Sequence, residues 1–437
     1  MPNCAKTQDS ARPVAPGAPG RDETRRDTTL DLWRGLALAD MVLVHLAWNR
    51  VLPESLGALV RDHTRFAAGG LVLLSGLTAA LIFGPKLASG GVVCRAATRA
   101  LLRRSIELVL LDRAIGFSVG LLVAFRIALF QDRDAPPDLL GVLLFQKPGV
   151  TGGLLLLYAF LLTGTPLLLA VSRRFGAPVL AVASAALYAL AWATGDLLYW
   201  PAWTFPLAHW QPIFVTGLLA APAYLRLRAG AARGRVVWAI ASVALFAGVW
   251  IVRFGDALGL VALPEALHLD FVKVPLQPAE LLWYLAATQA ALATSWAAVE
   301  AWPRLQRLGA WIWLYGRNGL LVYGLHLFTE VPIATWTGRM QAPVWQCLLL
   351  VAIDFAVLAA AARLSERGTL ARESGRVVGR LRETLRAPVA AAAAIALCCL
   401  GLGATRIVTL SRFGPSLPVA VAEEGIAPVH DAVRSAD

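Results

Sequence analysis

Residues 31–49 read DLWRGLALADMVLVHLAWN, an apolar stretch long enough to cross a bilayer and interrupted by four ionisable side chains. Arg34 and His45 are eleven positions apart, close to three helical turns, so a helix presents both on one face. At about 1.5 Å per residue, His45 lies about 16 Å further along the helix than Arg34. Asp31 precedes Arg34 by three positions, a spacing at which the two side chains can pair. The stretch predicts a membrane-spanning helix with a cation at one edge and an imidazole deep inside.

The composition extends this prediction to the whole chain. Of its 437 residues, 58% are hydrophobic and 16% are charged, and the mean hydropathy is +0.63. Soluble domains are about 45–50% apolar and about 25% charged. These values exclude a cytosolic enzyme, a disordered protein and a disulfide scaffold. We expect an all-α, polytopic transmembrane helical bundle of about 10–11 spans, with membrane lipid as its main partner and no nucleic acid bound.

The distribution of basic residues predicts the topology. Placing the N-terminus in the cytoplasm puts 26 of the 40 Lys and Arg residues on the inner side, as the positive-inside rule requires. We therefore expect a multi-pass protein of a bacterial inner (plasma) membrane with a cytoplasmic N-terminus. The eleven candidate spans are residues 35–53, 66–84, 105–128, 152–172, 177–196, 211–228, 235–254, 278–299, 308–328, 343–362 and 387–407.

These spans divide the chain into five segments. Residues 1–30 are polar and rich in Pro and Gly, which predicts a disordered cytoplasmic tail. Residues 31–362 form the main transmembrane domain, and 363–386 form a basic cytoplasmic linker. Residues 387–407 are expected to be a final transmembrane helix, followed by an extracytoplasmic tail at 408–437. The sequence carries no signal for an oligomeric state.

Charged groups inside a membrane span are costly, so each is a candidate for function. A buried, neutral imidazole such as His45 suits a general base acting on a hydroxyl. A cation such as Arg34 at the entrance suits an anionic, phosphate-bearing donor. Read as structural residues, Arg34 is a positive-inside anchor and His45 an interhelical hydrogen-bonding group. A transporter or flippase for a glycan or lipid-linked envelope intermediate is the main rival function, and a scaffold for an envelope complex is a second.

Four segments, taken in order, resemble the acyltransferase-3 superfamily, and within it the OpgC-type proteins, named for succinylation of osmoregulated periplasmic glucans. The first is residues 30–38 with His45, similar to the superfamily's Arg-x10-His signature. The others are Leu-Ser-Gly at 74–76, Trp-Gln-x-x-Phe-x-x-Gly at 210–217, and Gly-Arg-Asn at 316–318 followed by Leu-His at 325–326. Together they extend over about residues 30–330.

The resemblance implies an acyl-CoA-dependent O-acyltransferase, with 31–362 as its acyltransferase domain. An acetyl or succinyl group would move from cytoplasmic acyl-CoA, the co-substrate, to a hydroxyl of an extracytoplasmic carbohydrate or glucan. His45 would be the catalytic base, and Arg34 with Asp31 would place the donor. We expect substrate-binding roles for Asn49, Trp210, Gln211, Asn318 and His326.

A basic helix face provides further candidates for donor binding. Arg95, Arg99, Arg103 and Arg104 recur at helical spacing and can hold the phosphates of coenzyme A or face lipid head groups. We expect Glu107, one turn further on, to pair with Arg103 or Arg104. For Arg317, a buried partner such as Asp112 or Asp354 is expected. The sequence has no Cys/His cluster or HExxH motif, so we expect no metal.

Overall fold

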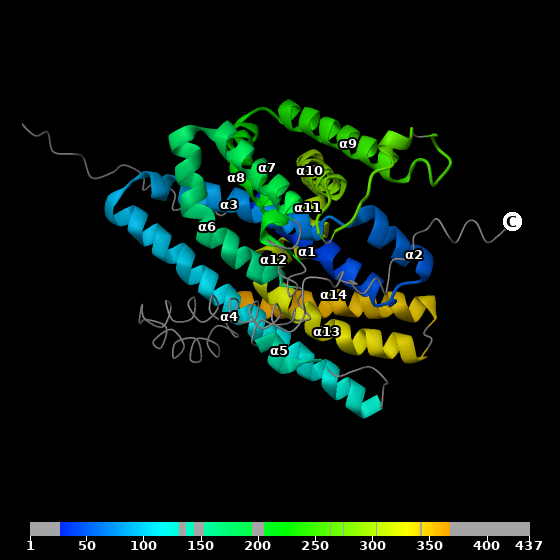
Figure 1. The fold of residues 1–437 in the computed structure, drawn as a ribbon. Coiled ribbons are helices and arrows are strands. Elements are labelled where there is room, and N and C mark those ends of the chain that lie inside the picture. Colours follow the sequence, from blue (N-terminus) through cyan, green and yellow to red (C-terminus); the bar gives the residue numbers. More distant parts are fainter. Residues whose placement is uncertain are drawn as a thin grey trace, which may run out of the picture.

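The computed structural model describes residues 27–367, apart from 131–136, 144–152, 195–204, 263, 274, 303 and 341–342. Within these ranges every regular element is a helix, which confirms the predicted all-α polytopic bundle (Figure 1). The longer helices are α1 (Thr28–Trp48), α3 (Ala67–Ala88), α4 (Gly91–Phe130), α6 (Leu154–Phe175), α7 (Ala177–Ala193), α8 (Leu207–Ala229), α9 (Ala232–Phe254), α10 (Pro278–Ala301), α13 (Gly319–Met340) and α14 (Val344–Glu366). The shorter ones are α2 (Glu54–Ala58), a π-helical segment η1 (Leu59–Thr64), α5 (Leu139–Leu143), a 3-10 turn η3 (Glu265–Leu267), α11 (Arg304–Leu308) and α12 (Ala310–Arg317).

Of the first ten expected spans, all but the ninth fall mainly on one described helix each. Five helical stretches are long and apolar enough to cross a membrane, and they are Glu54–Ala88, Gly91–Phe125, Leu154–Phe175, Ala232–Phe254 and Val344–Glu366. This supports a membrane protein, and the exact number of spans stays a prediction. The expected final helix at 387–407 and the tail at 408–437 lie outside the described residues, as do most of the N-terminal tail and of the linker.

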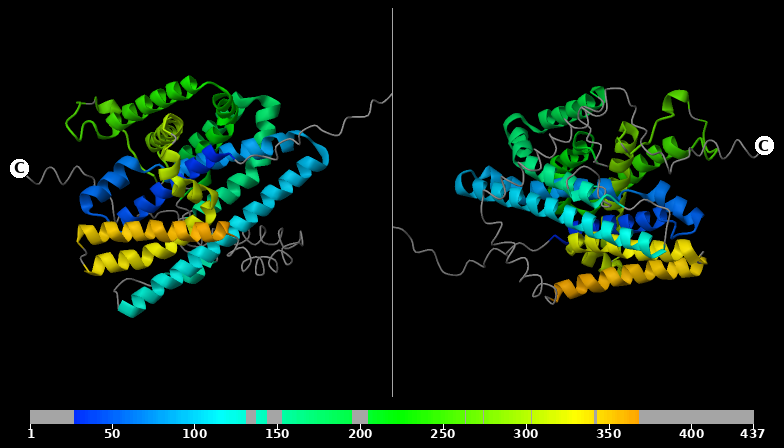
Figure 2. Two further views of the ribbon diagram at one scale, coloured as in Figure 1. Left: turned by 180° about the vertical axis from the view of Figure 1, so that it is seen from behind. Right: turned by 60° about the horizontal axis from the view of Figure 1, so that its bottom comes forward.

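Two helices depart from the expected boundaries. The ninth span is not one helix, because α12 ends at Arg317 and α13 begins at Gly319. Asn318 lies at the break, and its side-chain amide donates to the Leu314 carbonyl at 3.0 Å. In contrast, α4 joins the basic stretch and the third span into one rod of 40 residues, which crosses the molecule diagonally in Figures 1 and 2. At about 1.5 Å per residue this rod is about twice as long as the bilayer core is thick.

Two helix pairs cross at glycines so closely that no side chain fits between them. A Cβ atom at Gly35 of α1 would collide with the Ile312 carbonyl of α12, and one at Gly316 of α12 would collide with the Asp31 carbonyl of α1. Small residues let membrane helices approach in this way. The crossing fixes α1, which carries the ionisable side chains, against the centre of the bundle.

The second crossing joins α3 and α8 in the same reciprocal manner. A Cβ atom at Gly76 would collide with the Phe214 carbonyl, and one at Gly217 would collide with the Leu73 carbonyl. Gly35, Gly76, Gly217 and Gly316 all lie in or beside the four motif segments identified in the sequence. Those segments therefore include the contacts that assemble the bundle.

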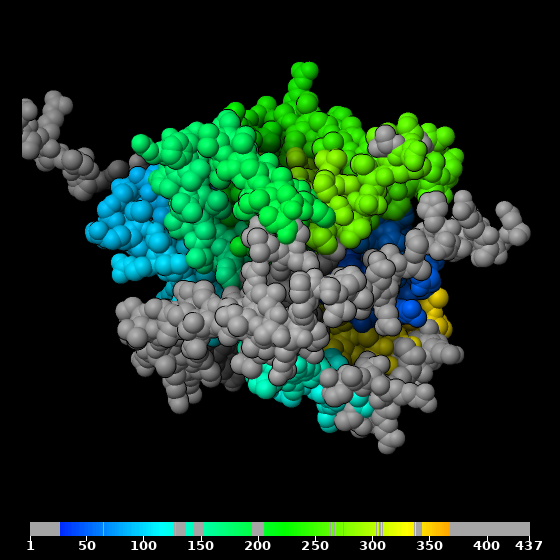
Figure 3. All heavy atoms as spheres, viewed as in Figure 1, coloured from blue at the N-terminus to red at the C-terminus, as the bar shows by residue number. Residues whose placement is uncertain are grey.

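Helix α9 lies at the edge of the bundle and has an exposed apolar face. The helix forms the upper margin of the view in Figure 1, and its atoms form the upper surface in Figure 3. Val236, Val237, Ile240 and Val243 of α9 are exposed. Exposed aliphatic side chains along a whole helix are typical of contact with lipid.

Replacing Gly217 by Ala should destabilise the bundle by about 1–3 kcal/mol, because the added methyl group overpacks the contact with α3. Gly248 on α9 is the matched control, because nothing lies within 4 Å of the position of its Cβ atom. Gly248→Ala should be neutral or slightly stabilising. Thermal unfolding of the two variants in detergent measures the difference, and equal midpoints would contradict the crossing.

Candidate functional site

The first turns of α1 hold the predicted cation in place. Arg34 Nη1 lies 3.4 Å from Asp31 Oδ1, which confirms the expected pairing. Asp31 is buried, whereas the Arg34 side chain is 29% exposed. Arg34 Nη2 also donates to Thr78 Oγ1 at 2.6 Å. The guanidinium group is thus fixed from two helices, α1 and α3, while part of it stays accessible.

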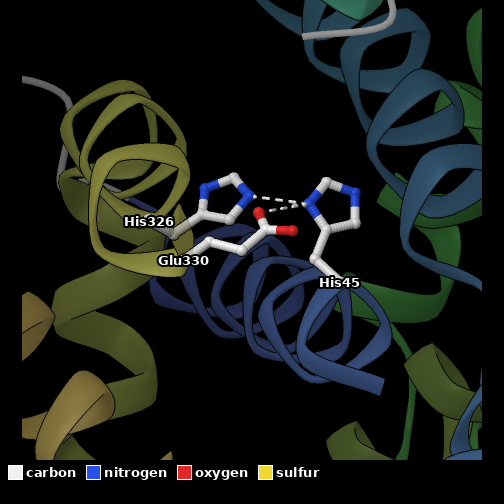
Figure 4. A group of neighbouring side chains, drawn as sticks. All are labelled: His45, His326 and Glu330. Carbon is white, nitrogen blue, oxygen red and sulfur yellow. Dashed lines mark hydrogen bonds and ion pairs between the residues drawn. The ribbon is translucent and has the colours of Figure 1, made fainter. Parts of the chain in front are cut away.

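Three turns further along α1, His45 meets two side chains of α13. His326 Nε2 lies 3.1 Å from His45 Nδ1, and Glu330 Oε2 lies 3.4 Å from the same nitrogen. Figure 4 shows all three side chains converging, with the other ring nitrogen of His45 pointing away. His326 and Glu330 are four positions apart, so one face of α13 presents both. We call these three residues the His45 cluster.

Asn49, predicted to bind substrate, supports the cluster. Its side-chain amide donates to the His45 carbonyl at 2.9 Å and to the Glu330 carboxylate. These bonds hold Glu330 against α1. Glu330 is a functional candidate that is missing from the predicted site, although a spacing of four positions from His326 puts both residues on one face of a helix.

His45 Nδ1 has two polar neighbours, His326 Nε2 at 3.1 Å and Glu330 Oε2 at 3.4 Å, and the ring tautomer depends on which of them it bonds. When Nδ1–H donates to the Glu330 carboxylate, the ring proton is on Nδ1. The Nε2 atom then keeps its lone pair and points away from the cluster. An imidazole oriented in this manner by a carboxylate is suited to general-base catalysis.

The same three side chains are also compatible with a metal ion. The ligand atoms of His45, His326 and Glu330 lie within 4.8 Å of one another. Two imidazoles and a carboxylate are a known catalytic zinc ligand set. In the part of the chain that the structure describes, this is the group of His, Cys, Asp and Glu side chains that could hold a metal.

Two cavities approach Tyr323, one associated with Arg34 and the other with His45. The Arg34 cavity has a volume of about 360 Å³, and its lining includes Arg34, Ser75, Arg104, Tyr158 and Tyr323. The His45 cavity is about 60 Å³, and its lining includes His45, Trp48, Arg65, Lys273 and Tyr323. Tyr323 belongs to both linings. The predicted donor-side cation and the predicted base therefore line separate cavities that share one aromatic residue, Tyr323.

The four predicted donor-binding arginines of α4 are not equivalent. Of these four, only Arg104 lines the Arg34 cavity. Arg99, Arg103 and Arg104 border an open groove of about 520 Å³ along α4, and Arg95 lines neither space. Glu107 pairs with Arg103 at 3.0 Å and with Arg104 at 3.2 Å, which confirms that expectation.

Three predicted substrate-binding residues line neither cavity. Trp210 is fully buried and packs against Phe205 and Tyr284, which line the His45 cavity. Gln211 exchanges 2.7 Å hydrogen bonds with Ser184, which join α8 to α7. Asn318 lies at the helix break. Substrate binding by Trp210, Gln211 and Asn318 stays a prediction.

Arg317 has a different ion-pair partner from those expected. Its Nε lies 2.5 Å from Glu366 Oε1, near the end of α14. Asp112, one of the expected partners, pairs with its neighbour Arg113. Glu366 lies beyond the predicted tenth span, so the pairing depends on how α14 folds back onto α12.

The comparisons with known proteins give one positive result. No curated protein and no solved structure matches the chain. The family model described as OpgC protein matches residues 26–369, a range that begins just before α1, ends just after α14 and includes the whole His45 cluster. The chain therefore belongs to the OpgC family, and this membership indicates a transferase that modifies glucans.

Proposed function

We propose that the protein is an integral membrane O-acyltransferase of a bacterial inner membrane, with its N-terminus in the cytoplasm. It moves an acetyl or succinyl group from cytoplasmic acyl-CoA to a hydroxyl of an extracytoplasmic glucan. The observation that carries the proposal is the oriented His45, with Nδ1 against Glu330 and His326 and two cavities that share Tyr323. Family membership supports the glucan as acceptor.

The chemistry requires one base and one activated acyl group. His45 Nε2 takes the proton of the acceptor hydroxyl as the hydroxyl oxygen attacks the thioester carbonyl. The C–S bond then breaks, the new ester remains on the acceptor, and the proton leaves with the coenzyme A thiolate. Glu330 holds the ring in the required tautomer and stabilises the imidazolium ion formed in between.

The donor is held from the Arg34 side. Arg34 and Arg104 contribute two cations to the lining of the larger cavity, and Arg side chains suit phosphate oxygens. Asp31 positions Arg34 through their ion pair. The acyl end of the donor would then extend towards Tyr323, and the acceptor hydroxyl would approach from the His45 cavity.

Replacing the base should slow transfer strongly without unfolding the protein. His45→Gln should lower kcat by about 10²–10⁴-fold, the usual contribution of a general base. Glu330→Gln should lower kcat with little change in KM, because it disturbs the tautomer and not substrate binding. The assay counts free coenzyme A thiol released in a glucan-dependent manner by purified protein in detergent.

His268 provides the matched control for this assay, because it is exposed in the α9–α10 connection and lines neither cavity. His268→Gln should keep wild-type activity. Full activity in His45→Gln would refute the role of the base. Absence of transfer in folded wild-type protein with either donor would favour the transporter or flippase function.

Chelation distinguishes proton transfer from metal catalysis at the His45 cluster. If the cluster works without a metal, as we propose, EDTA or 1,10-phenanthroline should leave the transfer rate unchanged. Loss of activity on chelation, restored by Zn²⁺, would show that the three side chains act as metal ligands. The metal content of the purified protein, measured by mass spectrometry, provides an independent readout.

Donor binding should depend on Arg104 more than on Arg95. Arg34→Ala and Arg104→Ala should each raise KM for acyl-CoA about tenfold, the effect of losing one hydrogen bond to a charged group. Arg95→Ala should change KM little, because Arg95 lines neither cavity. Initial rates at varied acyl-CoA concentration measure this, and equal effects of Arg95→Ala and Arg104→Ala would contradict the assigned cavity.

A further inference from the structure

Two basic side chains near the His45 cavity share a single carboxylate. Arg65 Nη2 and Arg253 Nη1 bind the two carboxylate oxygens of Glu280, at 2.9 and 2.8 Å. Glu280 is fully buried on α10, so one carboxylate serves two guanidinium groups. Lys273, in the α9–α10 connection, is a third cation, and it lines the His45 cavity together with Arg65.

Lys273 is held against the site by aromatic rings. Its Nζ lies 5.1 Å from the ring centroid of Trp48 and 4.8 Å from that of Phe205. Trp48 in turn stacks on His45, with ring centroids 5.8 Å apart. No carboxylate forms an ion pair with Lys273 within the described ranges of the chain. The ammonium group therefore lies close to the base without a negative partner.

An anion in this cavity would be favourable for both Lys273 and Arg65. Burial and, to a smaller extent, the nearby charge of Arg65 lower the pKa of Lys273 to about 8, and the charge of Glu280 offsets only part of this shift. The Nε–H of Arg65 is buried and has no hydrogen-bond partner among the described residues. Leaving a buried donor unsatisfied is costly, and an anion in the cavity would remove that cost.

We propose that Arg65 and Lys273 form a carboxylate-binding subsite in the His45 cavity, which selects a substrate carrying an acidic substituent close to the reacting group. The cavity of about 60 Å³ exceeds the roughly 10–15 Å³ that one water molecule needs, so a carboxylate has room there. This inference rests on the proposed acyl transfer, and it specifies in addition that one of the two substrates is negatively charged near the reacting group. The carboxylate belongs either to the far end of the acyl group or to the glucan acceptor.

Lys273→Met removes the charge and keeps most of the side-chain length. Transfer is measured for wild type and variant with succinyl-CoA and with acetyl-CoA, each with a neutral glucan and with a glucan carrying carboxylate groups. We expect the variant to lose about ten- to hundredfold in kcat/KM for the acidic substrate relative to its neutral counterpart. Lys273→Arg should restore most of this preference.

The four substrate combinations identify the source of the carboxylate. A loss confined to succinyl-CoA places it on the acyl group, and a loss confined to acidic glucan places it on the acceptor. Arg50→Met is the control, because Arg50 is exposed and lines neither cavity. An equal loss for all four combinations, or no loss for any, would overturn the subsite.

A binding measurement separates this proposal from acyl transfer itself. Succinate should raise the unfolding temperature of wild-type protein in detergent more than neutral succinamide does, and this difference should disappear in Lys273→Met. If this result is obtained from protein that transfers no acyl group, the subsite stands and the proposed reaction falls. If transfer is observed but succinate and succinamide act alike on wild type, the subsite falls and the reaction stands.

Discussion

The close approach of helix backbones at two glycine crossings is the constraint on which the rest of the structure depends. Gly35 and Gly316 bring α1 against α12, and Gly76 and Gly217 bring α3 against α8. Arg34 lies one residue before the first of these glycines, and Thr78, its hydrogen-bond partner, lies two residues after Gly76. A larger residue at any of the four positions would force a helix away from its partner. The motifs thus contain packing contacts as well as candidate site residues.

Much of the fold and part of the site were predictable from the sequence because both depend on helical periodicity. Hydropathy located the helices, and the spacing of Asp31, Arg34 and His45 placed these residues on α1 as the structure has them. The break at Asn318 was not predictable, because a polar residue within an apolar run is compatible with a continuous helix. Ion pairs between helices were equally unpredictable, so Asp112 or Asp354 was expected as the partner of Arg317, whereas the structure pairs it with Glu366.

The roles of two residues of the His45 cavity, Arg65 and Lys273, could not be predicted from the sequence. Arg65 directly precedes the predicted span 66–84 and Lys273 precedes the span 278–299 by five residues, and basic residues beside spans usually serve as membrane anchors. Only the fold shows that Arg65 shares Glu280 with Arg253 and that Lys273 reaches Trp48. Trp210 and Gln211 show the reverse: they stand in a motif, yet their described contacts are with neighbouring helices.

The break between α12 and α13 lets one interrupted span reach two cavities. Gly319 and Leu320, the first residues of α13, line the Arg34 cavity together with Arg34 and Arg104. The dipoles of α12 and α13 meet at Asn318 with ends of opposite sign, so the break itself adds little net charge there. The same span carries His326 two turns further on and Glu330 three turns further on, and these two side chains lie against His45 beside the second cavity.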